Sequence, residues 1–256
     1  IVFGDWSSDV CSSDLMTSAQ DPQKPAAISV QGLSKRYNLQ PVLKDLSLEV
    51  TDGSLCVLVG ANGAGKTTLL RIIASLVRPD DGTVSLHGAP LENNPALRRQ
   101  IGYLGHQSLF YSDLNAIENL SHFARLYRLD ERQQRVAEAI ESVDLVKHQH
   151  KPVRTYSRGM LQRLAIARAL LHDPSILLLD EPYTGLDKEA AQALDERLRA
   201  LHRPGRALLI AAHDPQRMLS FASHVAWLRD GRITHHQAVD KLSETPDLHR
   251  YLQEAA

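Results

Sequence analysis

Residues 60–67 read Gly60-Ala61-Asn62-Gly63-Ala64-Gly65-Lys66-Thr67, and this stretch decides the fold of the chain. An apolar run, 55–59, precedes the stretch, and a helical pattern follows it from Thr68. A buried strand, a glycine-rich turn and a helix, in that order, form the context that a phosphate-binding loop requires. Glycines let backbone N–H groups close around a polyphosphate, and the helix N-terminus adds positive potential. The stretch therefore predicts nucleotide binding.

The polar side chains at the end of this loop have separate expected roles. Lys66 is expected to reach the β- and γ-phosphates, and the Thr67 hydroxyl is expected to bind Mg²⁺. The alternative, a glycine-rich turn that binds nothing, is disfavoured because the flanking segments fit a strand and a helix. The residues expected to contact the nucleotide here are Gly60, Asn62, Gly63, Ala64, Gly65, Lys66, Thr67 and Thr68.

Length and composition narrow the possible classes of protein. The chain has 256 residues, enough for one large α/β domain or for a core with an inserted subdomain. Its formal net charge of −1 gives no basic field that would indicate nucleic-acid binding. Its longest apolar stretches, such as 176–179 and 207–212, are far shorter than the ~20 residues of a membrane helix. Any membrane role is therefore expected to come through a partner. The two cysteines, Cys11 and Cys56, are too few for a disulfide framework.

The N-terminal segment is expected to lie outside the folded domain. Residues 1–15 have no usable periodicity, lack the features of a signal peptide and precede Met16, so they are interpreted as a non-native leader. Residues 16–26 are rich in Pro, Gln, Ser and Asp, and we expect a disordered tail there.

Strand and helix patterns alternate along the rest of the chain. Strands are expected at 28–30, 46–50, 55–59, 83–86, 101–104, 176–179 and 207–212, and helices at 161–171 and 188–202. Two helical patterns, from 115 and at 131–143, indicate an inserted helical subdomain at about 108–158, and 225–228 with 232–234 predicts a hairpin. Repeated β-α units imply an α/β fold with a mostly parallel sheet. We expect this domain to span 27–240 and a C-terminal tail to span 241–256.

A second acidic element follows one of the predicted strands. Asp180 and Glu181 come directly after an apolar run, 176–179. A buried strand can deliver Asp180 to the Mg²⁺ beside Thr67, and the next carboxylate can polarise the attacking water. The alternative is a solvated acidic turn capped by Pro182. The phosphate loop earlier in the chain favours the catalytic interpretation.

The segment before that strand carries a family resemblance. Tyr156-Ser157-Arg158-Gly159-Met160, with Asp180-Glu181-Pro182 and Thr184-Gly185-Leu186-Asp187, resembles the nucleotide-binding domain of ATP-binding cassette (ABC) transporters. The usual family signature is Leu-Ser-Gly-Gly-Gln. Ser157 and Gly159 are kept here, whereas Met160 replaces the glutamine and removes one polar contact.

The resemblance implies roles for further residues. Gln107 matches the glutamine loop, which links Mg²⁺ and the attacking water to the helical insertion, and His213 matches the histidine that contacts the γ-phosphate. Asp187 matches the loop that communicates between two ATP sites, and Tyr37 stands where the family stacks an aromatic ring on adenine. Taken singly, such a histidine is usually structural and such a tyrosine usually belongs to the core.

The resemblance also implies an activity and partners. It implies an ATPase with ATP and Mg²⁺ as cofactors, built on a P-loop NTPase (RecA-like) core with an N-terminal antiparallel β subdomain. It further implies a homodimer or paralogue dimer that sandwiches two ATP molecules, bound to integral membrane permease subunits at the cytoplasmic face of a bacterial inner membrane. The residues 105–107, 114–120 and 156–160 look most like the ATPase of the haem exporter of cytochrome c biogenesis.

Other classes of protein remain open at this point. Within the family, the alternative is a multidrug, antibiotic or polysaccharide export ATPase. A soluble ABC ATPase acting on ribosomes or DNA is disfavoured, because the chain has neither a second cassette nor a basic patch. A P-loop kinase or GTPase outside the family would lack the signature around Ser157 and the residue matched by His213.

Two surface features complete the expectations. Leu109, Phe110, Tyr111 and Leu114 are apolar and close together after Gln107, which predicts a docking surface for membrane subunits. The alternative is that these four residues pack the insertion's own core. The histidines at 148, 150, 235 and 236 lack further ligands at suitable spacing, so they are expected to be solvated surface residues and not a metal site.

Overall fold

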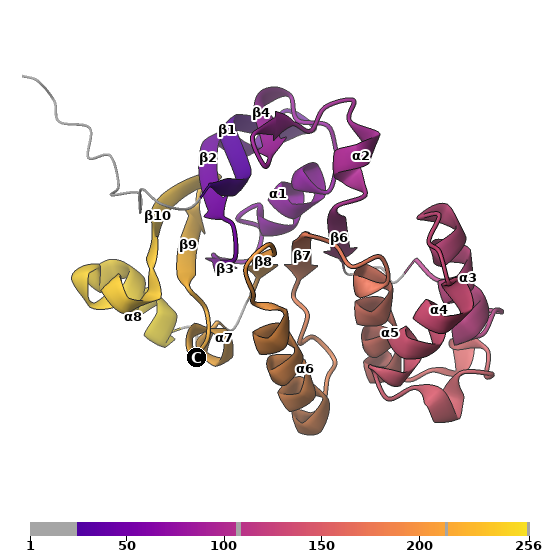
Figure 1. Ribbon diagram of the computed structural model, residues 1–256. Coiled ribbons are helices and arrows are strands. Elements are labelled where there is room, and N and C mark those ends of the chain that lie inside the picture. The colour runs from indigo at the N-terminus through magenta and orange to yellow at the C-terminus, as the bar shows by residue number, and fades with distance from the viewer. Residues whose placement is uncertain (1–24, 106–108, 213–214, 255–256) are drawn as a thin grey trace, which may run out of the picture.

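The computed structural model describes residues 25–105, 109–212 and 215–254 (Figure 1). The expectations for residues 1–15 and for most of 16–26 lie outside these residues, as do those for Gln107 and His213.

A six-stranded sheet forms the centre of the molecule, in the order β10-β9-β3-β8-β7-β6. Within it β3, β6, β7, β8 and β9 are parallel, and β10 pairs antiparallel with β9 at one edge. The bounds are β3 Leu55–Val59, β6 Ile101–Leu104, β7 Ile176–Asp180, β8 Ala207–Ala211, β9 His224–Arg229 and β10 Arg232–Ala238. The mostly parallel sheet and the C-terminal hairpin that the sequence predicts are confirmed.

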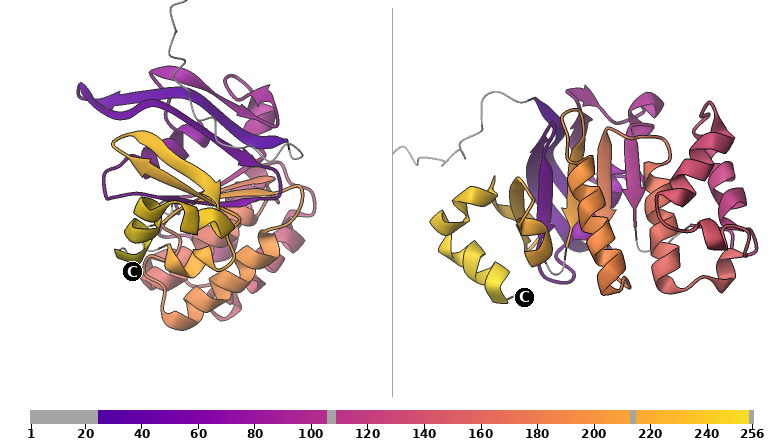
Figure 2. Two further views of the ribbon diagram at one scale, coloured as in Figure 1. Left: turned by 90° about the vertical axis from the view of Figure 1, so that its left-hand side faces the viewer. Right: turned by 60° about the horizontal axis from the view of Figure 1, so that its bottom comes forward.

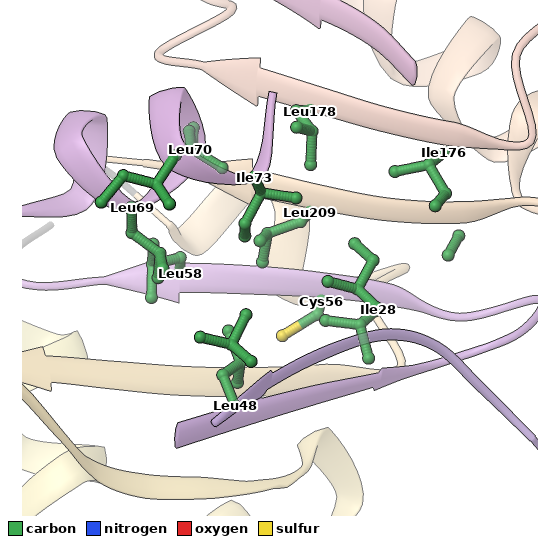
Figure 3. Close-up of a cluster of buried hydrophobic side chains, with 14 of the residues drawn as sticks. Ile28, Leu48, Cys56, Leu58, Leu69, Leu70, Ile73, Ile176, Leu178 and Leu209 are labelled. Atoms are coloured by element: carbon green, nitrogen blue, oxygen red, sulfur yellow. The ribbon is translucent and has the colours of Figure 1, made fainter. Parts of the chain in front are cut away.

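The central strands are continuous apolar runs because both faces of the sheet are covered. In β3, Cys56 and Leu58 pack in one core cluster, while the alternating residues Leu55, Val57 and Val59 pack in another. The first cluster contains side chains of α1 (Lys66–Ile73) (Figure 3). The second contains side chains of α5 (Arg158–Leu170) and α6 (Lys188–Leu201). The central sheet therefore separates two hydrophobic cores.

An antiparallel sheet lies over the first core, in the order β2-β1-β4-β5. The bounds are β1 Ala26–Tyr37, β2 Gln40–Thr51, β4 Asp81–Leu86 and β5 Ala89–Pro90, and the short helix α2 (Pro95–Arg98) follows. Figure 2 shows this sheet on one side of the central sheet and α6 on the other. The β1–β2 hairpin turns at Asn38 and Leu39, whose φ angles of 48° and 66° fit a type I′ turn. The antiparallel β subdomain predicted for the N-terminal part is confirmed.

A helical insertion lies at the β6 end of the central sheet (Figure 1). It contains α3 (Ala116–Leu126), α4 (Arg132–Glu141) and the short 3₁₀ turns η1 (Val146–His148) and η2 (Val153–Thr155). Asn115 begins α3 with a capping box: its side chain accepts from the Glu118 N–H, and the Glu118 carboxylate accepts from the Asn115 N–H. Leu120, Ile140 and Leu164 join α3, α4 and α5 in a third core cluster.

The structure corrects two expectations for the C-terminal part. The expected tail at 241–256 is corrected as far as residue 254, because η3 (Val239–Glu244) leads into α8 (Pro246–Glu254), whose Leu248 and Leu252 are buried in the second core. His236 is not a solvated surface residue: burial, with the nearby His224 ring, lowers its pKa to about 4.

The short helix α7 (Gln216–Leu219) precedes β9. Across the described residues, every helix is too short or too polar to cross a membrane.

Candidate active site

Two glycines of the loop 60–67 lie where no larger residue fits. Gly65 has a φ of 110°, and a Cβ built there would lie 2.7 Å from Leu43 Cδ2. A Cβ on Gly60 would lie 2.4 Å from the Leu228 carbonyl oxygen of β9. The loop is thus held tightly between β2 and β9, and only glycine permits that approach.

Lys66 begins α1 and curls back over the loop that precedes it. Its Nζ donates to the Gly60 carbonyl at 2.6 Å and to the Ala61 carbonyl at 3.2 Å, and the residue is 6% exposed. Burial lowers the pKa of Lys66, while the carboxylates of Glu181 and Asp180 act in the opposite direction. The loop therefore encloses an ammonium group, and the two nearby carboxylates favour its charged form. Such an ammonium group is suited to bind phosphate oxygens.

Thr67 and Asp180 meet although 113 positions separate them in the chain. The Thr67 hydroxyl donates to Asp180 Oδ1 at 3.1 Å, and Asp180 is 2% exposed at the end of β7. Hydroxyl and carboxylate oxygens are hard donors, and Mg²⁺ at nucleotide sites takes one or two protein ligands besides phosphate oxygens. The pair therefore fits Mg²⁺.

Glu181 follows Asp180 in an unusual backbone conformation. Its φ is 50°, and its N–H donates to the Ala211 carbonyl of β8 at 2.9 Å. Such a conformation in a residue other than glycine is held by its surroundings and is frequent at functional sites. The Thr184 hydroxyl lies 3.4 Å from Glu181 Oε2, and both residues line a cavity of about 120 Å³ together with Gly105 and Asp180. A carboxylate there can accept a proton from a water molecule.

The signature residues lie at the start of α5. Ser157 is exposed and caps the helix, since its hydroxyl accepts from the Met160 N–H at 3.2 Å. A Cβ on Gly159 would lie 3.4 Å from the Gly185 carbonyl oxygen, so the signature packs closely on the loop that follows Glu181. Asp187 caps α6 in the same way, because its carboxylate accepts from the Ala190 N–H at 2.8 Å.

Tyr37, the residue predicted to stack on adenine, does not line the cavity beside the loop, whereas the aromatic residue Trp227 does. Tyr37 ends β1 and is 43% exposed, with Lys35 Nζ 5.6 Å from its ring centroid. A cavity of about 910 Å³ beside the loop is lined by Asn62, Gly63 and Trp227, among others. Trp227 could not be predicted as a residue of this cavity, because an aromatic residue in a predicted strand normally belongs to the core.

The structure thus brings together the loop residues, Asp180 and Glu181 within one chain. Ser157 and Gly159 are placed at a separate helix N-terminus that faces solvent.

Comparisons with known proteins give a consistent result. The family model described as ABC transporter matches residues 43–184. The ABC transporter ATP-binding protein NatA of Bacillus subtilis is 35% identical over 226 residues, which cover 85% of this chain and 92% of NatA. A Nod factor export ATP-binding protein I of Cupriavidus metallidurans is 36% identical over 210 residues, covering 81% of this chain and 69% of that protein.

A solved structure shows the same fold. It is a dimeric ATP-binding cassette in a post-hydrolysis state bound to ADP and Pi, with a TM-score of 0.76 and 26% sequence identity. The match covers 83% of this chain and 98% of that cassette.

Proposed function

This chain belongs to the ABC transporter family as an ATP-binding subunit, and we propose that it energises export across the bacterial inner membrane. As a member of that family it binds and hydrolyses ATP. One observation supports the assignment of the ATP site to particular residues of this chain. It is the 3.1 Å hydrogen bond from the Thr67 hydroxyl to Asp180 Oδ1, next to the enclosed ammonium group of Lys66. This is the arrangement that a Mg²⁺–nucleotide site needs.

Each residue of the site has a proposed role in hydrolysis. Lys66 holds the β- and γ-phosphates, while Thr67 and Asp180 hold Mg²⁺, which neutralises phosphate charge when bound. Glu181 takes a proton from the attacking water. His213 contacts the γ-phosphate, and Gln107 acts on Mg²⁺ and the water. Tyr37 stacks on adenine.

A second copy of the chain, or a paralogue, is proposed to complete each ATP site. Ser157 is exposed at the N-terminus of α5, where N–H groups and the helix dipole favour an anion. A facing chain can therefore present its ATP to Ser157 and Gly159, and Asp187 then lies near the junction of the two sites. The dimeric cassette that resembles this chain supports such an assembly.

Integral membrane subunits are the proposed transport path, at the cytoplasmic face of the membrane. Purifying the chain from host membranes in detergent tests this class of function. We expect integral membrane proteins to remain bound. Ribosomes in their place would support the soluble alternative.

The docking surface for those subunits is proposed at the start of the helical insertion. Leu109 is 58% exposed and Tyr111 is 55% exposed, whereas Phe110 and Leu114 are partly buried and Phe110 packs against two of the core clusters. The exposed members, and not the whole set of four, form the candidate contact.

Substituting Tyr111 tests that surface. In a Tyr111→Asp variant we expect transport to fall about tenfold while basal ATP hydrolysis stays within about twofold of wild type, since a charge opposes an apolar contact. The measurement is transport and ATPase activity in vesicles with the membrane subunits. Leu76→Asp, at a leucine that is 58% exposed outside the insertion, is the matched control and should leave both activities unchanged. A Tyr111→Asp protein that fails to fold would instead place Tyr111 in the core of the insertion.

Haem is the cargo that the signature and the segment 105–120 favour, and the alternative is export of a drug, antibiotic or polysaccharide. The relative described as a Nod factor export protein supports export without favouring haem. Deleting the gene in its host separates the two. Loss of covalently bound haem from c-type cytochromes, restored by the wild-type gene, supports haem export. Normal cytochromes with increased sensitivity to antibiotics support the alternative.

A further inference from the structure

Polar side chains at the C-terminal end of α5 and just after it cover the edge of the central sheet at β6. The Gln100 carbonyl accepts from the Ile176 N–H of β7, so the carbonyls of Ile101 and Tyr103 point away from the sheet. Arg168 donates to the Tyr103 carbonyl at 3.1 Å, and His172 Nε2 lies 3.1 Å from the Ile101 carbonyl. Arg168 of α5 and His172, which lies just after α5 ends at Leu170, therefore contact alternate carbonyl groups of an edge strand.

Arg168 is also enclosed by two aromatic rings of the helical insertion. It is 6% exposed, and its guanidinium lies 5.7 Å from the ring centroid of Phe110 and 5.2 Å from that of Phe123. The two rings meet edge to face at 6.3 Å. Burial lowers the pKa of Arg168, but a guanidinium stays protonated in proteins. The chain therefore keeps a buried cation at this place, stabilised by a carbonyl oxygen and two ring faces.

The contacts of Arg168 join two parts of the molecule. Tyr103 belongs to β6 of the central sheet, while Phe110 and Phe123 belong to the insertion. In the chain, Tyr103 precedes Gly105 by two residues, and Gly105 lines the cavity that Asp180 and Glu181 also line. A shift of the helical insertion can therefore be transmitted through the Arg168 side chain to the end of β6, beside the cavity lined by Asp180 and Glu181.

We propose that Arg168 is a positioning residue for ATP hydrolysis, which fixes the end of β6 beside Asp180 and Glu181 according to the position of the helical insertion. Its guanidinium is suited to this because it donates a directed hydrogen bond and presents a flat face to both rings. The proposal rests on the proposed catalytic roles of Asp180 and Glu181.

Arg163 provides a matched control on the same helix. Its guanidinium also binds backbone carbonyls, those of Val143 and Asp144, each at 3.4 Å, and lies 3.6 Å from the Asp144 carboxylate. These contacts lie within the helical region, away from β6. Replacing Arg163 thus removes a guanidinium and its contacts with backbone carbonyls on the same helix without touching the edge of the central sheet.

The test compares Arg168→Met and Arg163→Met in the full chain, by steady-state ATPase kinetics and thermal melting. We expect Arg168→Met to lower kcat about tenfold with the KM for ATP within about twofold, because a small misplacement of catalytic groups affects the chemical step. Arg168→Lys should recover part of that loss, since an ammonium can donate to the Tyr103 carbonyl but lacks the flat face. Arg163→Met should lower the melting temperature and leave kcat unchanged.

Two results would overturn the proposal. One is a kcat for Arg168→Met equal to that of Arg163→Met at matched fractions of folded protein. The other applies if Arg168→Met does not fold: a kcat for Arg168→Lys equal to that of wild type would then show that the planar group has no positioning role. A Glu181→Gln variant that hydrolyses ATP normally would contradict the proposed function itself, and the two failures are therefore distinguishable.

Discussion

A Lys66→Ala variant is expected to lose ATP hydrolysis almost completely. The lysine side chain is 6% exposed and its ammonium lies inside the phosphate loop, 2.6 Å from the Gly60 carbonyl. Removing it takes away the charge that organises the β- and γ-phosphates as negative charge develops there. We expect a loss on the order of 10²–10³ in kcat, the size seen when one such group is removed from a preorganised site, together with weaker ATP binding. Steady-state phosphate release measures the first effect and a fluorescent ATP analogue the second.

The control for Lys66→Ala is Lys147→Ala, which removes an exposed lysine charge in the helical insertion. Its ATPase activity should equal that of wild type. Melting curves establish that both variants fold. Hydrolysis by folded Lys66→Ala protein within about twofold of wild type would contradict the assignment of residues 60–67 as the phosphate loop.

A Glu181→Gln variant is expected to bind ATP and to hydrolyse it on the order of 10²–10³ times more slowly than wild type. Glutamine keeps the shape of the side chain and can accept from the Thr184 hydroxyl, which lies 3.4 Å from Glu181 Oε2. It cannot take a proton from water. Because ATP then persists, the isolated subunit should form a dimer in ATP and return to a monomer in ADP, as measured by light scattering. Normal hydrolysis would rule out Glu181 as the base.

A second substitution at Ser157 tests whether that dimer shares its ATP sites. Ser157 caps α5, and both asparagine and aspartate can replace it as a cap, so the helix is preserved in either variant. On the Glu181→Gln background we expect Ser157→Asp to abolish the ATP-dependent dimer, because a carboxylate would face the γ-phosphate of the other chain. Ser157→Asn should dimerise with no more than about tenfold weaker affinity. Equal dimerisation of the two double variants would contradict a site composed of two chains.

Much of the fold could be predicted from local patterns. The runs 55–59, 176–179 and 207–212 are apolar at every position because each strand is buried on both faces. A continuous apolar run of this kind can be recognised within a short segment of sequence. The strand, glycine turn and helix around residues 60–67 are likewise local. The capping residue Asn115 indicated the start of the insertion's first helix for the same reason. By contrast, the helix α8 was not predicted, although Pro246 at its start and Leu248 and Leu252, four residues apart, are helix signals; both leucines are buried in the second core.

The sequence by itself determined the class of fold, the phosphate loop and the acidic pair at the end of β7, because each depends on the order of residues within a short segment. Only the tertiary structure decided which distant groups meet. Thr67 lies 3.1 Å from Asp180 because α1 packs over the strand that ends in that carboxylate. Arg168 reaches Tyr103, Phe110 and Phe123 because α5 covers the open edge of the sheet. In the sequence Arg168 is one basic residue of a helical pattern. Its role depends on a carbonyl of the edge strand and on two aromatic rings, which lie beside it only in the folded structure.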